Sequence, residues 1–142
     1  MLTPHAPPAR TPRERATVLC IDDEPLVLDF YRDLLEPRGY RTLTVTDGLQ
    51  GLAMARQDPP DVILLDVMLQ GLSGFDICRK FRADDALRNI PIILITAWDD
   101  ANVATTGREA RADLTLRKPA DAESILAAIQ QVRGETSGPP HG

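Results

Sequence analysis

The segment DVILLDVMLQGLSG, residues Asp61–Gly74, begins as an apolar run and then places a carboxylate, Asp66, at the end of that run. Residues 62–65 have the length and aliphatic composition of a strand that is buried on both faces. A charge at the end of such a strand costs free energy unless a partner compensates it. Asp66 therefore has either a structural partner or a chemical role.

Outward from this segment, the sequence alternates between apolar strand patterns and helical patterns. Strands are predicted at residues 16–23, 41–47, 61–66, 90–97 and 113–119, and helices at 24–36, 48–57, 74–84, 99–111 and 121–134. Near-continuous apolar strands that alternate with helices indicate a parallel sheet covered on both faces. Because crossovers are right-handed, the expected α/β fold is a doubly wound five-stranded parallel sheet flanked by five helices.

Length and composition favour one globular domain. The chain has 142 residues, of which 43% are hydrophobic and 26% charged. We expect the domain to span residues 17–133, with flexible tails at 1–16 and 134–142, because the tails are rich in proline or glycine. Cys20 and Cys78 lie in apolar segments and are predicted to be buried core residues rather than a disulfide.

Charge and hydropathy limit the expected cellular location and the expected classes of partner. The net charge of −5 does not suggest binding to nucleic acid or to an acidic membrane surface. No apolar run approaches the roughly 18 residues of a membrane span, and the N-terminal segment is rich in proline and arginine, unlike a signal peptide. We therefore expect a cytoplasmic protein.

Polar residues recur at the carboxyl ends of the predicted strands. They are Asp22 and Asp23 after the first strand, Asp66 after the third, Thr96 after the fourth and Lys118 after the fifth. A doubly wound sheet brings these strand ends to one edge, where ligands bind. Thr46 and Asp47, after the second strand, are interpreted as turn residues.

This combination predicts phosphoryl transfer to an aspartate. Three adjacent carboxylates repel one another and favour a bound cation, and hard oxygen ligands suit Mg²⁺. A carboxylate oxygen of Asp66 could then attack a phosphoryl group that Lys118 and the Thr96 hydroxyl contact. Each residue alone also has an ordinary structural explanation, as a helix cap, a strand end or a surface cation, and only the combination favours the chemical one.

With these residues, the chain resembles the response-regulator receiver domains of bacterial two-component signalling. The matching motifs are VLCIDDEP at 18–25, the opening segment at 61–74, IPIILITA at 90–97 and LRKP at 116–119. The resemblance spans roughly residues 17–133 and implies a flavodoxin-like (βα)5 fold. It also implies a phosphorylated switch that catalyses only its own phosphorylation and dephosphorylation, and not an enzyme with a separate substrate.

The resemblance assigns a role to each matching residue. Asp66 would accept the phosphoryl group from a histidine kinase or a histidine phosphotransfer protein. Thr96 would be the switch hydroxyl, and Lys118 the cation that pairs with the phosphate. The Mg²⁺ ligands would be the side chains of Asp23 and Asp66, Asp22 largely through water, and the backbone carbonyl of Met68.

Four positions depart from the usual pattern of that family. Thr115 replaces an aromatic residue whose ring normally moves with the switch hydroxyl, and Gln70 replaces a frequent proline. Arg111 replaces a frequent glycine, and Ala120 a frequent phenylalanine. These departures concern output and turn geometry, and none concerns the phosphorylation chemistry.

Met68 and Trp98 suggest a hypothesis about the lifetime of the phosphorylated state. Each lies two residues after a site residue, Met68 after Asp66 and Trp98 after Thr96, where the family's side chains flank the attacking water. Bulky apolar groups there would exclude water and prolong the acyl phosphate. The alternative is that Trp98 simply packs on a neighbouring helix.

The fourth predicted helix has little to bury. Residues 99–110 offer mainly Val103 and alanines, with Gly107 in the middle. Weakly packed elements are the ones that move most readily, so we expect this segment to shift or become ordered on phosphorylation. Partner contact would then involve this segment and the fifth strand and helix, in a monomer or a weak homodimer with an unknown downstream protein target.

One alternative remains open, and a second is disfavoured by the sequence. The departures at Thr115, Arg111 and Ala120 are compatible with a degenerate receiver that serves as a non-switching interaction scaffold. A haloacid-dehalogenase-like phosphatase would also use an aspartate nucleophile, but it needs a second aspartate two residues later, where this chain has Met68. No P-loop motif occurs in the sequence.

Overall fold

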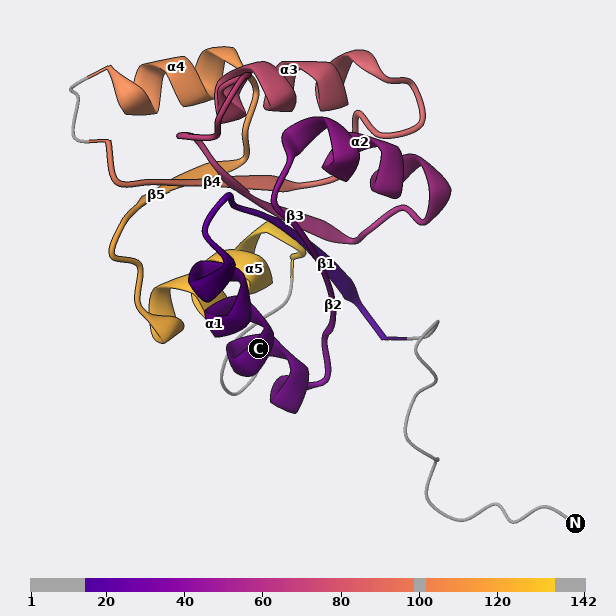
Figure 1. The fold of residues 1–142 in the computed structure, drawn as a ribbon, viewed down its shortest axis with the longest axis vertical. Coiled ribbons are helices and arrows are strands. Elements are labelled where there is room, and N and C mark those ends of the chain that lie inside the picture. Colours follow the sequence, from indigo (N-terminus) through magenta and orange to yellow (C-terminus); the bar gives the residue numbers. More distant parts are fainter. Residues whose placement is uncertain (1–14, 99–101, 135–142) are drawn as a thin grey trace, which may run out of the picture.

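A computed structural model describes residues 15–98 and 102–134, and its centre is a five-stranded parallel sheet (Figure 1). The strand order is β2-β1-β3-β4-β5, so the chain reverses its winding direction between β1 and β3. The predicted tails at 1–16 and 134–142 lie mostly outside the described residues. The strands are β1 (Thr17–Ile21), β2 (Arg41–Val45), β3 (Val62–Asp66), β4 (Ile92–Thr96) and β5 (Leu114–Arg117).

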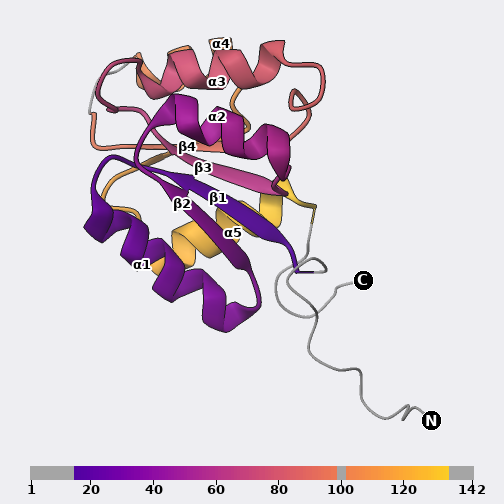
Figure 2. The ribbon, with the colours of Figure 1, turned by 45° about the vertical axis from the view of Figure 1, so that its right-hand side comes forward.

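Helices cover both faces of this sheet (Figures 1 and 2). The helices are α1 (Pro25–Leu35), α2 (Gly48–Gln57), α3 (Gly74–Ala83), α4 (Val103–Glu109) and α5 (Ala122–Val132), with a short 3-10 helix η1 (Glu36–Arg38) after α1. Helices α1 and α5 lie on one face, and α2, α3 and α4 on the other. The predicted doubly wound architecture is confirmed, and no helix among the described residues has the length and apolar character that a membrane crossing requires.

The buried strands explain why the sheet forms as predicted. All residues of β1, β3 and β4 are buried, and their alternate side chains feed two apolar clusters, one on each face. Cys20 and Cys78 are both fully buried and are not paired with each other, so the prediction that they are core residues is confirmed.

Local capping residues set where several helices begin and end. The Asp47 side chain accepts hydrogen bonds from two amides in the first turn of α2, which explains the turn role predicted for it. Ser73 and Asp121 likewise cap α3 and α5, each by accepting a hydrogen bond from one backbone amide. Gly39, at φ 93°, ends η1 in the left-handed conformation that glycine adopts most readily.

Helix α4 is the shortest and most exposed of the five. It has seven residues, and of these only Gly107 is buried. The sparse packing expected for this part of the chain is therefore observed, although residues 99–101 of the predicted segment lie outside the described residues. Its exposure follows from its composition, because alanines and threonines provide little apolar area.

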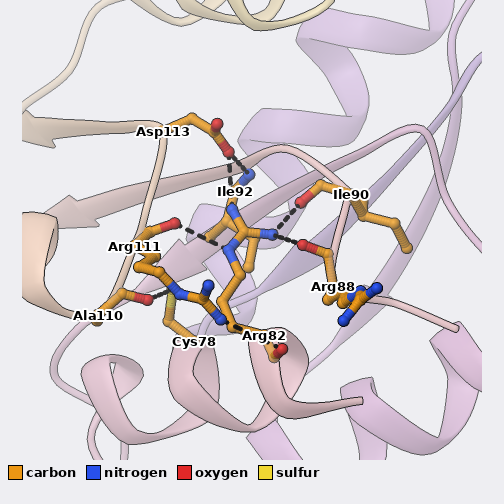
Figure 3. A network of polar contacts seen from close by, with 8 residues as sticks. All are labelled: Cys78, Arg82, Arg88, Ile90, Ile92, Ala110, Arg111 and Asp113. Carbon is orange, nitrogen blue, oxygen red and sulfur yellow. Dashed lines mark hydrogen bonds and ion pairs between the residues drawn. The ribbon is translucent and has the colours of Figure 1, made fainter. Parts of the chain in front are cut away.

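A buried guanidinium joins α3 to the segment between α4 and β5 (Figure 3). Arg82 donates four hydrogen bonds, to the carbonyl oxygens of Arg111, Arg88 and Ile90 and to Oδ2 of Asp113, all at 2.7–2.9 Å. The same Asp113 oxygen accepts the Ile92 amide, which starts β4. One helical turn before Arg82, the Cys78 thiol donates to the Ala110 carbonyl at the end of α4.

We predict that Arg82→Met lowers the free energy of unfolding by about 3 kcal/mol, because it leaves three carbonyls and a carboxylate without their donor. Arg79→Met, on the same helix, is the matched control, because the Arg79–Asp76 pair is about half exposed. This control should cost less than about 0.5 kcal/mol. Urea unfolding measures both, and equal losses would contradict the assigned role of Arg82.

Candidate functional site

The carboxylates of Asp22, Asp23 and Asp66 meet at the carboxyl edge of the sheet. One oxygen from each lies within 4.8 Å of one from each of the others. The register explains the meeting: Ile21 of β1 pairs with Leu65 of β3, so the next residue of each strand, Asp22 and Asp66, extends from the same edge. Asp22 and Asp66 are buried, and Asp23 is partly buried.

Lys118 reaches this cluster from the end of β5. Its Nζ lies 2.9 Å from Oδ2 of Asp22 and 3.6 Å from Oδ1 of Asp66. The Lys118 amide donates to the Thr96 carbonyl at 2.7 Å, which fixes the backbone beyond β5 against the end of β4. Burial alone would lower the pKa of Lys118, but the hydrogen bond with Asp22 and the negative charges of Asp66 and Asp22 outweigh it and raise that pKa.

The carboxylate of Asp66 is destabilised by its surroundings. Burial and then the charge of Asp22 raise its pKa above the ordinary value of 3.8, against the opposing effects of Lys118 and of the Met68 amide. The Met68 amide lies 3.3 Å from Oδ1 of Asp66 and donates to it. One ammonium group faces three carboxylates, so the cluster contains more negative charge than its protein partners neutralise.

Thr96 is buried at the end of β4, one residue beyond Ile95, which pairs with Asp66. Its hydroxyl oxygen accepts a hydrogen bond from the Trp98 amide at 2.9 Å. The structure thus brings together the predicted site residues: Lys118 contacts Asp22 and Asp66, Asp23 completes the carboxylate cluster, and Thr96 lies at the adjacent strand end.

Two supporting residues of the site were missed by the sequence analysis. At Gly74, the first residue of α3, an added Cβ would collide with the backbone carbonyl of Asp66, so only glycine allows α3 to start this close to the site. Tyr31 of α1 is also buried, and its burial, together with the charges of Asp22 and Asp66, raises the pKa of its phenol. The available signal for Gly74 was its place directly after the cap residue Ser73. No sequence signal existed for Tyr31.

Trp98 packs on a neighbouring helix, as one of the two hypotheses stated. Its ring lies 6.3 Å from the ring of Phe75 in α3, at an angle of 44°. Trp98 remains 46% exposed, and with Met68, 56% exposed, it lines a shallow groove of about 320 Å³ next to Asp66. Trp98 therefore packs on α3 and also lies beside the site.

Several known proteins are similar to this chain in sequence and in fold. The family model of the response regulator receiver domain matches residues 18–130. The protein PilH of Pseudomonas aeruginosa is 35% identical over 117 residues, which are 82% of this chain and 97% of PilH. The DNA-binding dual master transcriptional regulator RpaA of Synechocystis is 36% identical over 123 residues, 87% of this chain but only 51% of RpaA.

Solved structures agree with these relatives. The chemotaxis protein CheY4 of Vibrio cholerae superimposes with a TM-score of 0.79 at 29% sequence identity, over 83% of this chain and 98% of CheY4. Residues 18–130, which the family model matches, include the carboxylate cluster and all of the sheet and helices except the first residue of β1 and the end of α5. The chain therefore belongs to the response regulator receiver domain family, whose members act as phosphoacceptors in two-component signalling.

Proposed function

We propose that Asp66 is the phosphoacceptor and that a phosphohistidine on a histidine kinase or a histidine phosphotransfer protein is the donor. The observation that supports this most directly is the position of Lys118, whose ammonium lies 2.9 Å from Asp22 and 3.6 Å from Asp66. A cation so placed can contact the oxygens of a phosphoryl group on Asp66. The scaffold alternative is not favoured, because the complete set of charged groups is retained around Asp66.

The transfer requires one bond to form and one to break. A carboxylate oxygen of Asp66 attacks the phosphorus of the donor, and the bond from phosphorus to the imidazole nitrogen breaks with its electron pair on nitrogen. The imidazole then takes a proton from water, and Asp66 becomes an acyl phosphate. Lys118 pairs with the phosphoryl oxygens, and the Thr96 hydroxyl donates a hydrogen bond to one of them.

The acidic cluster has the chemistry of a Mg²⁺ site. Three carboxylate oxygens within 4.8 Å of one another are hard ligands, and burial and the charge of Asp22, which raise the pKa of Asp66, make its ionised form costly without a cation. We assign Asp23, Asp66 and the Met68 carbonyl as direct ligands and Asp22 as a ligand through water. When bound, Mg²⁺ would neutralise the incoming phosphoryl group and orient it.

Phosphorylation should change how the domain contacts a partner. A phosphoryl group adds roughly −1.5 to −2 charge at neutral pH, enough to bias a weakly packed element. Helix α4 is the candidate, because Gly107 is its one buried residue among Val103–Glu109. We propose a phosphorylation-dependent protein target and a cytoplasmic location. DNA binding is a property of RpaA itself, and the match covers only 51% of that protein.

We predict that acetyl phosphate with Mg²⁺ adds one phosphoryl group to the protein, and that EDTA or Asp66→Asn abolishes the addition. The reason is that the nucleophile and the cation that orients the phosphoryl group are both required. Intact mass measures the product. Asp47→Asn is the matched control: Asp47 lies at the same sheet edge and outside the cluster, asparagine can still cap α2, and the variant should react like wild type.

Phosphorylation of Asp66→Asn at the wild-type level would place the acceptor elsewhere. Loss of phosphorylation in Asp47→Asn, with the fold intact, would show that the reaction depends on the whole edge rather than on the cluster.

We predict that Asp66→Asn is more stable than wild type at pH 7 in EDTA and that the difference shrinks toward about pH 4. Folding raises the pKa of Asp66 above 3.8, so its ionised form opposes folding at any pH above the folded-state pKa. Protonation removes this cost as the pH falls through that value. Melting temperatures across this range measure the effect, and Asp29→Asn, on the exposed face of α1, should show little change at any pH.

We predict that Trp98→Ala shortens the half-life of the phosphorylated state several-fold. Trp98 and Met68 form an apolar flank beside Asp66, and its removal admits water to the acyl phosphate. Loss of phosphoryl groups after removal of the donor, followed by intact mass, gives the half-life. Leu49→Ala is the control, because Leu49 is 52% exposed on α2 and does not line this groove; equal half-lives in all three proteins would exclude the shielding role.

A further inference from the structure

At Gly107, the backbone of α4 lies close to the side chain of Thr115 in β5. A Cβ added to Gly107 of α4 would lie 2.6 Å from the Thr115 hydroxyl oxygen and 3.5 Å from Leu94. The helix backbone therefore approaches the strand directly over the Thr115 side chain. Thr115 has a short side chain that fits this space, and its reorientation would displace very little.

Thr96 is instead connected to Trp98. The Thr96 side chain is 1% exposed, and its hydroxyl oxygen accepts the Trp98 amide at 2.9 Å. This bond sets the backbone that leaves β4, because it closes a turn over residues 96–98. A rotation of the Thr96 hydroxyl away from this turn would leave the Trp98 amide without that acceptor.

Trp98 is also connected to Asp66 through the start of α3. Its ring contacts Phe75, and the preceding residue, Gly74, packs directly on the backbone of Asp66 and Val67. The Gly74 amide donates to the Val67 carbonyl at 2.7 Å, which ties α3 to the end of β3. The chain segment that follows β4 and the one that follows β3 both lie next to the site, and they meet at the Trp98–Phe75 contact.

We propose that Trp98 is the residue that reports phosphorylation of Asp66 to the surface, through the Thr96–Trp98 hydrogen bond and the Trp98–Phe75 contact. The proposal rests on Asp66 being the phosphoacceptor. A phosphoryl group presents new acceptor oxygens to the Thr96 hydroxyl, and the rotation that reaches them breaks the bond to the Trp98 amide. The ring of Trp98 then leaves its position on Phe75.

The surface that changes is the one beside the site rather than the outer face of β5. Trp98 and Met68 are two of the five large hydrophobic residues that are markedly exposed in the described part of the chain. A displaced indole alters the shape of the groove that these two residues line. Thr115 is a bystander in this scheme, because its short side chain carries no ring whose movement could change the surface.

The chain has a single tryptophan, so its fluorescence reports on Trp98 alone. We expect beryllofluoride with Mg²⁺, a mimic of the phosphoryl group, to change the emission of the full chain in a saturable way. Thr96→Ser keeps the hydroxyl and should keep this change, whereas Thr96→Ala should lose it. Thr115→Val is the matched control on the neighbouring strand and should respond like wild type.

Intact mass after acetyl phosphate treatment shows whether each variant still accepts a phosphoryl group. A full emission change in a phosphorylatable Thr96→Ala would overturn the proposal, since it would reflect only charge near the indole. If Thr96→Ala does not accept the group, Phe75→Leu decides: a reduced emission change supports the proposal, and an unreduced one overturns it. Phosphorylation of wild type without any emission change also overturns it, whereas absence of phosphorylation refutes the proposed function itself.

Discussion

The crowding of three carboxylates at one sheet edge is the constraint on which the rest of the structure depends. Parallel pairing of β1 with β3 places Asp22 next to Asp66, and Lys118, which follows the carboxyl end of β5, reaches both. Burial and the neighbouring charge of Asp22 raise the pKa of Asp66, and one ammonium cannot neutralise three carboxylates, so the edge favours a cation or a phosphoryl group with its metal. The apolar strands beneath supply the stability that tolerates this repulsion.

Most of the fold follows from short-range patterns in the sequence. Fully buried strands read as continuous aliphatic runs, and caps such as Asp121 mark where helices begin, because both depend on neighbouring residues. The main site residues were also predictable, since the end of a parallel strand fixes the edge at which a side chain such as Asp66 emerges. Order along the chain was therefore sufficient to predict which groups meet.

Contacts that depend on distances between helices were not predictable in this way. The fit of Gly107 over Thr115 requires the separation of α4 from β5, and the four bonds of Arg82 require the paths of two loops. Arginine in a helix with charged neighbours usually indicates an exposed face. The opposite is observed at Arg82 because backbone carbonyls, which have no sequence signature, provide most of its partners.

The buried charges of Arg82 and Asp66 lie at opposite edges of the same sheet, and they differ in how fully the protein compensates them. Arg82 lies near Ile92 and Asp113, at the edge where β4 and β5 begin, and four acceptors compensate its charge within the protein. Asp66 lies where the strands end, and its charge is not fully compensated. A protein that compensates one buried charge with four hydrogen bonds and the other only in part concentrates its rigidity at one edge. Its capacity to respond to an incoming charged group is then located at the other edge.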